Sequence, residues 1–574
     1  MSSVRTPARH AHGCGCGGPL LAGLGALLTV PTPTGQRSRP VPPTGTTVIR
    51  GATVLPVDDA FSEAEAIAFS GDRIIAVGSQ DEVRAVAGDD ATVLDRTGAV
   101  ILPGFIEPHA HLLPTAMLDT MLDVGPFRFD TVDEALDHLR ANVSADGSWL
   151  RARQFDPSLQ AGPDELTTEH LDSVSAATPV IVLNASGHFG YANSVALAAA
   201  GIDRDTPDID GSPYGRHADG APNGVLKGQP AMLSVLATDP AIADVDILAQ
   251  ARAVAERASA TGITTICDQG TGFLLGPGDI DLFEALVADG LPTRLRYSVY
   301  DNRADAFDEL GLAPGDGDEY VRATGWKIIA DGSNQGRTGH QRDPYLGTDD
   351  RGFPYVDPDA LVEKARARAE QGWQLVVHAN GDRAIDDTLA ALATAVEAGG
   401  ADRRHRIEHC SILHDEQIAR IAELGLSPSF LIGHVHFWGQ VFRDRVFGPD
   451  KAAKLDRAAS CDAAGIRWTI HSDEMVTPMD PMRCIHNAVT RELWREPGTV
   501  LNADECVPVE AAIRAMTADA AWQCHADHEL GTLEPGKLAD LTVLAEDPRT
   551  VDPRSLADVE VVETWMGGVR RYSA

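Results

Sequence analysis

The order of hydrophobic and polar residues divides the chain into a β-rich start, a long middle and a β-rich end. In the first part, short apolar and β-branched runs such as 73–77 are separated by turn residues, which predicts β-strands. The same pattern returns near the end of the chain, for example at 540–544. Neither end has enough strands to close a sandwich alone, so we expect residues 46–103 and 529–574 to form one small β-sandwich domain together.

The middle of the chain, residues 104–528, alternates strand-like apolar runs with alanine-rich amphipathic segments such as 384–398. Eight such runs predict an α/β protein with a (β/α)8 TIM barrel. Residues 115–255, approximately, separate the first two runs, which is too long for one βα unit, so we expect an inserted subdomain there. The eight runs are 100–105, 262–267, 295–300, 326–330, 374–378, 405–409, 427–431 and 467–471.

Residues 1–45 are of low complexity, and we expect them to be disordered or signal-like. They contain an apolar run, 19–30, of about twelve residues, which is too short to span a bilayer. A short basic segment precedes this run, as in a signal peptide, but no clear cleavage site follows it. We therefore expect a cytoplasmic protein, with export as the alternative because of this apolar segment.

Charge and cysteine content narrow the classes of function. The 574 residues include 48 Lys and Arg against 84 Asp and Glu, for a formal net charge of −36. Binding of nucleic acid requires a basic footprint, so we expect no nucleic-acid partner. The eight cysteines show neither zinc-finger spacing nor a disulfide framework, and we expect them to be reduced. The sequence predicts no membrane span. The expected partner is a small-molecule substrate, and the sequence is compatible with a homo-oligomer.

The sharpest local feature is a His-x-His pair, His109 and His111, directly after the first predicted barrel strand. In an extended chain, side chains two residues apart lie on the same face, so both imidazoles can bind one cation. Other His-x-His pairs occur in the N-terminal tail and, as His434 and His436, after the seventh strand. The first pair differs from these because further candidate ligands follow it along the chain.

Three of these further candidates lie at the ends of predicted barrel strands. His378 closes the fifth strand, His409 closes the sixth, and Asp473 follows the eighth. Active sites of (β/α)8 barrels lie at the carboxyl ends of the strands, so these groups should meet the histidine pair on one rim. A single histidine of this kind is better explained as an ordinary capped or hydrogen-bonded polar residue, but four histidines and one aspartate on one rim favour a metal site.

Lys327 lies inside the fourth predicted strand, in a chain where 42 of the 48 basic residues are arginines. An ammonium group buried near divalent cations is disfavoured by desolvation and by like-charge repulsion. Carboxylated by carbon dioxide, the same side chain becomes an anion whose two oxygens can bridge two metals. The spacing alone supports two readings equally. One is the carboxylated lysine, and the other is an ordinary lysine whose stem packs on the barrel wall and whose amine reaches the rim.

Four short segments match motifs of one enzyme family. They are residues 330–333 after Lys327, 378–382, 471–473 and the C-terminal segment 531–541. With the histidine pair, they resemble the amidohydrolase superfamily, in particular its amidohydrolase-3 branch, which includes N-substituted formamide deformylases. The resemblance covers nearly all of the chain after residue 46. These motifs are specific for the branch and say little about the substrate.

The resemblance implies a site with two divalent metal ions, usually zinc. One ion would be held by His109, His111 and Asp473, the other by His378 and His409, and carboxylated Lys327 would bridge both. A hydroxide bridging two cations is a nucleophile near neutral pH, because the cations lower the pKa of bound water. Asp473 would take the proton from the attacking water and deliver it to the leaving amine.

Other residues are candidates for the substrate pocket. His188, in a Ser-Gly-His-Phe-Gly segment of the insertion, would donate to the substrate carbonyl or line the pocket, with a structural histidine as the equal alternative. His434, His436 and Trp438 are expected to form a substrate wall, and Asp331 is a further substrate-binding candidate. In a chain with only 5% aromatic residues, this cluster favours an apolar or aromatic substrate group.

The leading hypothesis is therefore a metal-dependent hydrolase of a C–N bond in a non-peptide amide, such as an N-substituted formamide or an N-acyl amine. An ester, lactone or carbamate hydrolase is the alternative within the same chemistry, since the same nucleophile attacks those carbonyls. A non-catalytic metal-binding protein on the same scaffold is a third reading. The presence of every expected ligand together with the proposed base argues against it.

Overall fold

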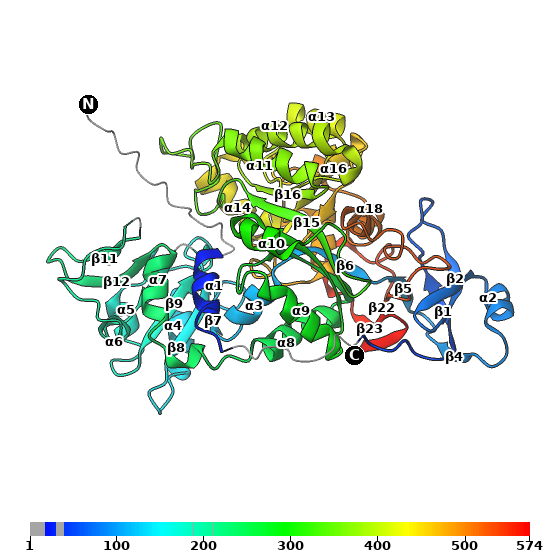
Figure 1. Ribbon diagram of the computed structural model, residues 1–574, viewed down its shortest axis with the longest axis horizontal. Helices are drawn as coiled ribbons and strands as arrows, with labels where there is room; N and C mark the ends of the chain where they lie inside the picture. Colours follow the sequence, from blue (N-terminus) through cyan, green and yellow to red (C-terminus); the bar gives the residue numbers. More distant parts are fainter. Residues whose placement is uncertain (1–17, 30–38, 188, 211) are drawn as a thin grey trace.

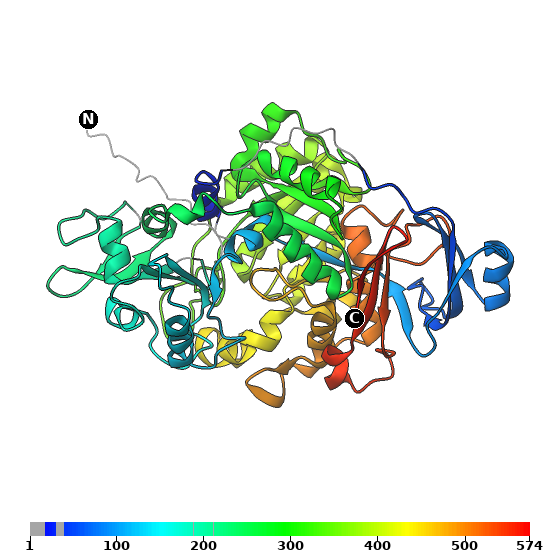
Figure 2. The same ribbon diagram turned by 90° about the horizontal axis from the view of Figure 1, so that it is seen from below.

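The computed structural model describes residues 18–29, 39–187, 189–210 and 212–574. Its centre is a barrel, flanked on one side by a sheet built from both chain ends and on the other by the inserted subdomain (Figure 1). A view from below shows the same order, with the subdomain and the terminal sheet at opposite ends of the long axis (Figure 2).

The barrel consists of eight parallel strands that are neighbours in chain order. The two edge strands are joined beyond their ends, where the Asp473 N–H donates to the His109 carbonyl at 3.1 Å and the His111 N–H donates to the Glu474 carbonyl at 2.9 Å. This arrangement confirms the predicted (β/α)8 fold. The strands are β6 (Phe105–Ala110), β13 (Ile263–Thr271), β14 (Arg294–Tyr300), β15 (Val321–Ile329), β16 (Gln374–Ala379), β17 (Arg406–His409), β18 (Ser427–Phe430) and β19 (Thr469–Ile470).

Amphipathic helices follow the strands and cover the outside of the barrel (Figure 1). In α12 (Asp382–Gly399), for example, the buried residues Ile385, Leu389 and Leu392 recur at helical spacing and form the face turned to the core. The other helices of this layer are α8 (Ile247–Ala260), α9 (Gly278–Ala288), α10 (Ala304–Leu310), α11 (Pro358–Glu370), α13 (Asp415–Leu424), α16 (Ala458–Ala463), α17 (Pro481–Thr490), α18 (Val509–Ala515) and α19 (Ala518–Gln523).

The first barrel strand lies later in the chain than the sequence suggested. Residues 100–105 were expected to form it, but β5 (Val100–Pro103) pairs with β1 (Thr46–Val54) and β22 (Leu541–Leu544) of the terminal sheet, and β6 begins at Phe105. Gly104 separates the two strands, and its N–H donates to the Asp540 carbonyl at 2.9 Å. A Cβ at Gly104 would overlap the Thr264 side chain, so glycine is required where the chain passes from one sheet to the other.

The two chain ends share one sheet of eight strands, as expected from their β-rich patterns. The hydrogen-bonded order is β24-β23-β22-β5-β1-β2-β3, with β4 beside β1, so the three C-terminal strands join the N-terminal strands where β22 pairs with β5. Its core includes Ile49, Ile67, Ile101, Leu541 and Trp565. The strands are β1 (Thr46–Val54), β2 (Ala64–Ser70), β3 (Arg73–Gly78), β4 (Thr92–Asp95), β22 (Leu541–Leu544), β23 (Val561–Met566) and β24 (Val569–Ser573).

The insertion between β6 and β13 contains its own six-stranded sheet, in the order β11-β12-β10-β9-β8-β7. A separate hydrophobic core, with Leu136, Phe155 and Val182 among its members, supports this sheet. One of its central strands is β9 (Val180–Asn184). The remaining elements are β7 (Leu122–Asp123), β8 (Leu150–Phe155), β10 (Phe189–Ala192), β11 (Tyr214–Arg216), β12 (Pro222–Lys227), α4 (Val132–Ala141), α5 (Thr168–Asp172), α6 (Ser194–Ala199) and α7 (Gln229–Leu236).

Part of the N-terminal apolar run forms a short helix, α1 (Gly18–Gly25), that packs against α7. Leu20, Leu21 and Leu24 are buried in the main core, and the Leu20 N–H donates to Gln229 Oε1 at 2.9 Å. Within the described ranges, no helix is long and apolar enough to cross a membrane. The expectation of a disordered or signal-like segment concerns mostly residues 1–17 and 30–38, which lie outside the described part of the chain.

Candidate metal centre

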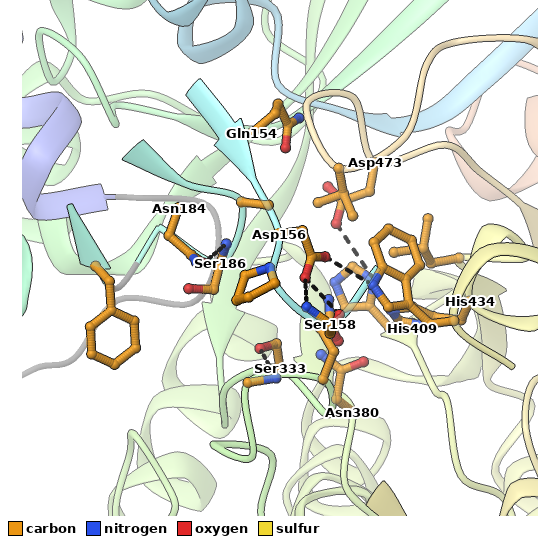
Figure 3. A pocket seen from close by; sticks show the side chains of 18 of the residues that line it. Gln154, Asp156, Ser158, Asn184, Ser186, Ser333, Asn380, His409, His434 and Asp473 are labelled. Carbon is orange, nitrogen blue, oxygen red and sulfur yellow. Dashed lines mark hydrogen bonds and ion pairs between the residues drawn. The ribbon is translucent and has the colours of Figure 1, made fainter. Parts of the chain in front are cut away.

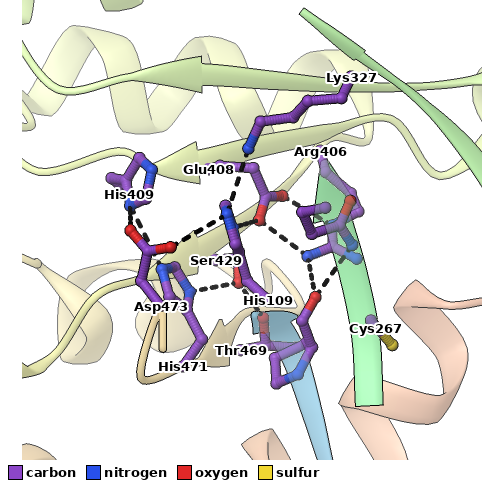
Figure 4. Close-up of polar contacts among 12 residues, drawn as sticks. His109, Cys267, Lys327, Arg406, Glu408, His409, Ser429, Thr469, His471 and Asp473 are labelled. Carbon is purple, nitrogen blue, oxygen red and sulfur yellow. Dashed lines mark hydrogen bonds and ion pairs between the residues drawn. The ribbon is translucent and has the colours of Figure 1, made fainter. Parts of the chain in front are cut away.

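The side chains expected to bind metal come together at the carboxyl ends of the barrel strands. His109 is in β6 and His111 follows it, Lys327 is in β15, His378 in β16 and His409 at the end of β17, with Asp473 three residues after β19. All are buried. Figure 4 shows His109, Lys327, His409 and Asp473 pointing toward one another.

Asp473 is at the centre of this group. Its Oδ1 lies 3.2 Å from His111 Nε2 and 3.6 Å from His109 Nε2, and its Oδ2 lies 3.9 Å from His409 Nδ1. Burial alone would raise the pKa of the Asp473 carboxyl, but interactions with His109 and His111 outweigh burial and hold the pKa well below its usual range. The carboxylate is therefore ionised at neutral pH and can act as a ligand or as a base.

The two other candidate ligands, His378 and His409, each have one ring nitrogen in contact with a neighbouring group and one ring nitrogen without a hydrogen-bond partner among the described residues. His378 Nε2 lies 3.2 Å from the Gly332 carbonyl and 3.1 Å from Asn380 Nδ2, while His409 Nδ1 lies 3.3 Å from His471 Nε2. Within the described ranges, His378 Nδ1 and His409 Nε2 have no hydrogen-bond partner. Burial lowers the pKa of His378 to about 3, so its ring is neutral, the form that binds metals.

These observations fit a metal centre. Buried polar nitrogens without partners are rare in folded proteins, and here they belong to ligand-type side chains that surround a carboxylate. His109, His409 and Asp473 place one potential ligand atom each within 4.8 Å of one another. Imidazole nitrogens with a carboxylate form the ligand set that zinc prefers.

Lys327 faces this cluster from the barrel wall. Its Nζ lies 3.2 Å from His109 Nε2, and its side chain is fully buried. Burial lowers the pKa of Lys327 to about 8, although the carboxylates of Glu408 and Asp473 oppose this shift. The structure thus places the lysine amine, buried, among the candidate ligands and not exposed at the rim.

Beneath the ligands lies a buried acid that the sequence analysis did not identify as functional. Glu408 contacts His109 Nδ1 and is itself held by Arg406, whose Nε and Nη2 donate to the Glu408 carboxylate at 2.7 and 2.9 Å. Arg406 Nη2 also donates to the Pro108 carbonyl at 3.0 Å. A carboxylate on Nδ1 fixes a histidine so that Nε2 faces the metal, which is a common arrangement behind metal ligands.

His471 is the second buried residue near the ligands that was missed. It stacks on His109 with ring centroids 4.6 Å apart, and its Nδ1 lies 2.9 Å from Ser429 Oγ. The Thr469 hydroxyl donates to Ser429 at 2.7 Å, which orients this chain of contacts. The sequence signal that could have identified His471 is its place at the end of the eighth predicted strand, two residues before Asp473.

Backbone strain marks two of the candidate ligands. His409 and Asp473 adopt positive φ angles of 64° and 53°, a region that residues other than glycine seldom occupy. At His409 the turn ends β17 and brings consecutive residues, Glu408 and His409, to the same cluster. Such strain is concentrated at functional sites, where the surrounding structure enforces it.

A cavity of about 210 Å³ opens onto three of the ligands, His378, His409 and Asp473. Figure 3 shows labelled side chains from the insertion on one side and from the barrel loops on the other. Asp156 of the insertion accepts a hydrogen bond from the Trp438 indole N–H at 3.2 Å, which closes one wall of the cavity. The insertion contributes Gln154, Asp156, Ser158, Asn184 and Tyr191, and the barrel loops contribute Ser333, Gln335, Asn380, His434 and Trp438.

The predicted substrate residues are not all at this cavity. His434 and Trp438 line it, but His436 lines a second cavity, and its Nδ1 lies 2.7 Å from the Glu492 carbonyl. Asp331 is fully buried and accepts hydrogen bonds from the backbone of Asn380, Gly381 and His340, so it shapes the loop that follows β16. His188 lies outside the described residues.

A π-helical turn, His434–Trp438, explains the divergence of His434 and His436. Residues two apart share a face in a strand but project to different sides of a helical turn. The two ends of this turn, His434 and Trp438, therefore face the first cavity, and its middle faces the second.

Comparison with known proteins agrees with this geometry. A family model described as "Amidohydrolase family" matches residues 92–572. The chain is 30% identical to an N-substituted formamide deformylase of Arthrobacter pascens over 92% of this chain and 98% of that protein. It is 29% identical to the putative amidohydrolase YtcJ of Bacillus subtilis, over 90% and 98% of the two chains.

The fold is also found in a solved structure. An uncharacterized metal-dependent hydrolase from Pyrococcus furiosus superposes with a TM-score of 0.69 at 21% identity, covering 88% of this chain and all of the other. The match of the family model extends over most of the chain. It begins in the N-terminal part of the terminal sheet, includes the barrel and ends in the C-terminal part of the same sheet. This chain belongs to the amidohydrolase family.

Proposed function

We propose that this metal-dependent hydrolase cleaves the C–N bond of a non-peptide amide of the N-substituted formamide or N-acyl amine type. The observation that carries the proposal is the set of buried imidazoles with free ring nitrogens around Asp473, open to a cavity of small-molecule size. The similarity to a formamide deformylase over nearly the whole chain supports the amide class.

Two divalent ions, with zinc as the proposed metal, fit the residues that converge at the rim. His109, His111 and Asp473 would hold one ion, His378 and His409 the other, and a carboxylated Lys327 would bridge them. When bound, such ions lower the pKa of water and polarise a substrate carbonyl. The fully buried position of Lys327 beside His109 supports the carboxylated form, because the free ammonium would lie among cations.

The side chains then have distinct tasks. Asp473, ionised and next to the cavity, accepts the proton of the attacking water and passes it to the leaving nitrogen. Glu408 and Arg406 hold His109 in place from below. Asn380 fixes His378 and contacts Ser411, whose hydroxyl donates to Asn380 Oδ1 at 2.7 Å and also lies 3.3 Å from His434 Nδ1.

The walls of the cavity restrict the substrate. Apolar and aromatic side chains such as Trp438, Leu431 and Tyr191 suit an alkyl or aryl group. Among the described residues, the lining includes the carboxylates of Asp156, Asp164, Glu165 and Asp473, and no lysine or arginine. We therefore expect neutral or cationic amides to be preferred over anionic ones.

The test is a substrate panel measured on the wild type and on Asp473→Asn. The panel contains N-substituted formamides, longer N-acyl amines, and esters with matched acyl groups. It separates an amide hydrolase from the alternative, an ester, lactone or carbamate hydrolase. The asparagine variant should lose amide hydrolysis by at least about a hundredfold, the lower range for loss of a general base. Retained hydrolysis in this variant, with an unchanged fold, would refute the role of Asp473.

A further inference from the structure

Two buried cysteines from distant parts of the chain meet inside the barrel, below the metal ligands. Cys267 lies in β13 and Cys524 directly follows α19, 257 residues later. Their sulfur atoms are 3.0 Å apart, within hydrogen-bonding distance for two thiols. Both are fully buried in a small apolar cluster with Ile106, Ala520 and Leu530. In the described part of the chain, these are the two cysteines whose sulfurs are hydrogen-bonded to each other.

The surroundings of this pair make its two thiols unequal in acidity. Arg406 Nη1 lies 3.8 Å from Cys524 Sγ, and the guanidinium of Arg296 contributes a second positive charge nearby. The hydrogen bond from Cys267, followed by these two arginines, lowers the pKa of Cys524 against the opposing effect of burial. The pKa of Cys267 is raised, because burial disfavours its thiolate. The pair thus combines one thiol that ionises more easily with one that keeps its proton.

We infer that Cys267 and Cys524 form an oxidisable dithiol, a modification site that a hydroperoxide converts into a reversible disulfide. The Cys524 thiolate attacks the terminal peroxide oxygen and becomes a sulfenic acid, releasing hydroxide when the oxidant is hydrogen peroxide. The Cys267 sulfur then attacks the sulfenic sulfur, a disulfide forms, and water leaves with the Cys267 proton. Overall, two thiols lose two electrons and two protons, and one peroxide is reduced to two waters.

This site is connected to the metal centre through a single arginine. Arg406, which contacts Cys524, is the same residue that holds Glu408 against His109. The sulfurs need to approach each other by only about 1 Å to reach the bond length of a disulfide. Arg406 and Glu408 therefore connect the oxidised cysteine pair to His109, a proposed metal ligand. The disulfide itself involves none of the proposed ligands.

The test uses the full-length metal-loaded protein. It is reduced, freed of reductant, exposed to hydrogen peroxide and then unfolded in excess iodoacetamide before peptide mapping. The expected product is a peptide pair joined through Cys267 and Cys524, two hydrogen atoms lighter than the reduced pair and released by dithiothreitol. Thermal unfolding should shift to higher temperature in the oxidised protein, because the cross-link restricts the unfolded chain.

Three single variants complete the design. Cys267→Ala and Cys524→Ala should each abolish both the linked peptide and the thermal shift. Cys461→Ala is the matched control, since Cys461 is also buried near a second cysteine, Cys410, but its sulfur makes no hydrogen bond to it among the described contacts. This control should keep the link.

The wild-type result stands even if an alanine variant fails to fold. Full alkylation of both cysteines after peroxide treatment, or oxidation of Cys524 to a sulfinic acid without a link, overturns the inference.

Discussion

Replacement of Glu408 by glutamine tests how the buried carboxylate supports the metal centre. Glutamine keeps the shape of the side chain but removes the charge that Arg406 binds at 2.7 and 2.9 Å and that contacts His109 Nδ1. Breaking a buried ion pair on one side costs about 3–5 kcal/mol of unfolding free energy. Loss of a carboxylate behind a metal-binding histidine weakens metal affinity by about 10–100-fold, which equals about 1.4–2.7 kcal/mol.

The two effects can be separated in one experiment. Stability is measured by chemical denaturation, and zinc affinity by competition with a chromophoric chelator. The double variant Arg406→Met with Glu408→Gln removes both charges, so it should recover much of the lost stability. Its zinc affinity should stay low, because His109 still lacks its carboxylate. Wild-type zinc affinity in the single variant would refute the reasoning that Glu408 positions His109.

Two further predictions concern the substrate wall and the response to acid. Trp438→Ala should raise KM several-fold with a smaller change in kcat, because Trp438 lines the cavity and bonds Asp156 without touching the ligands; a fall in kcat alone would place Trp438 in the chemistry instead. Burial lowers the pKa of His405 to about 4, below its value near 6.5 in the unfolded chain, so the unfolded state binds more protons and stability falls as pH drops from 6.5 toward 4. This pKa shift corresponds to about 3 kcal/mol of unfolding free energy. In denaturation curves, the His405→Asn variant should therefore lose less stability than the wild type between pH 7 and pH 4. Equal losses in the two proteins would contradict the assignment to His405.

The barrel and the rim positions of the candidate metal ligands were predictable because strand ends are visible in the sequence. His378, His409 and Asp473 lie at or just after the ends of predicted strands, and the fold places all such positions on one rim. The first strand was misplaced because residues 100–105 form one continuous apolar run. The need for glycine at position 104 appears only when Thr264, far along the chain, packs against it.

Residues that act through other residues were harder to predict. Nothing in the local pattern shows that Arg406 and Glu408 pair inside the barrel, since a charged side chain in a strand usually faces water. His434 and His436 face different cavities because they lie in a π-helical turn, which the His-x-His spacing does not reveal. The contact between Cys267 and Cys524 joins segments 257 residues apart, which no spacing rule anticipates.

The central claim, a centre with two metals, is tested most directly by metal content. The protein is purified without added metal or chelator, and its metals are counted per chain by elemental analysis, alongside Lys327→Ala. We expect about two zinc-like ions per chain in the wild type and fewer in the variant, which lacks the proposed bridge. One ion in both proteins, or none even after zinc is added, would contradict it.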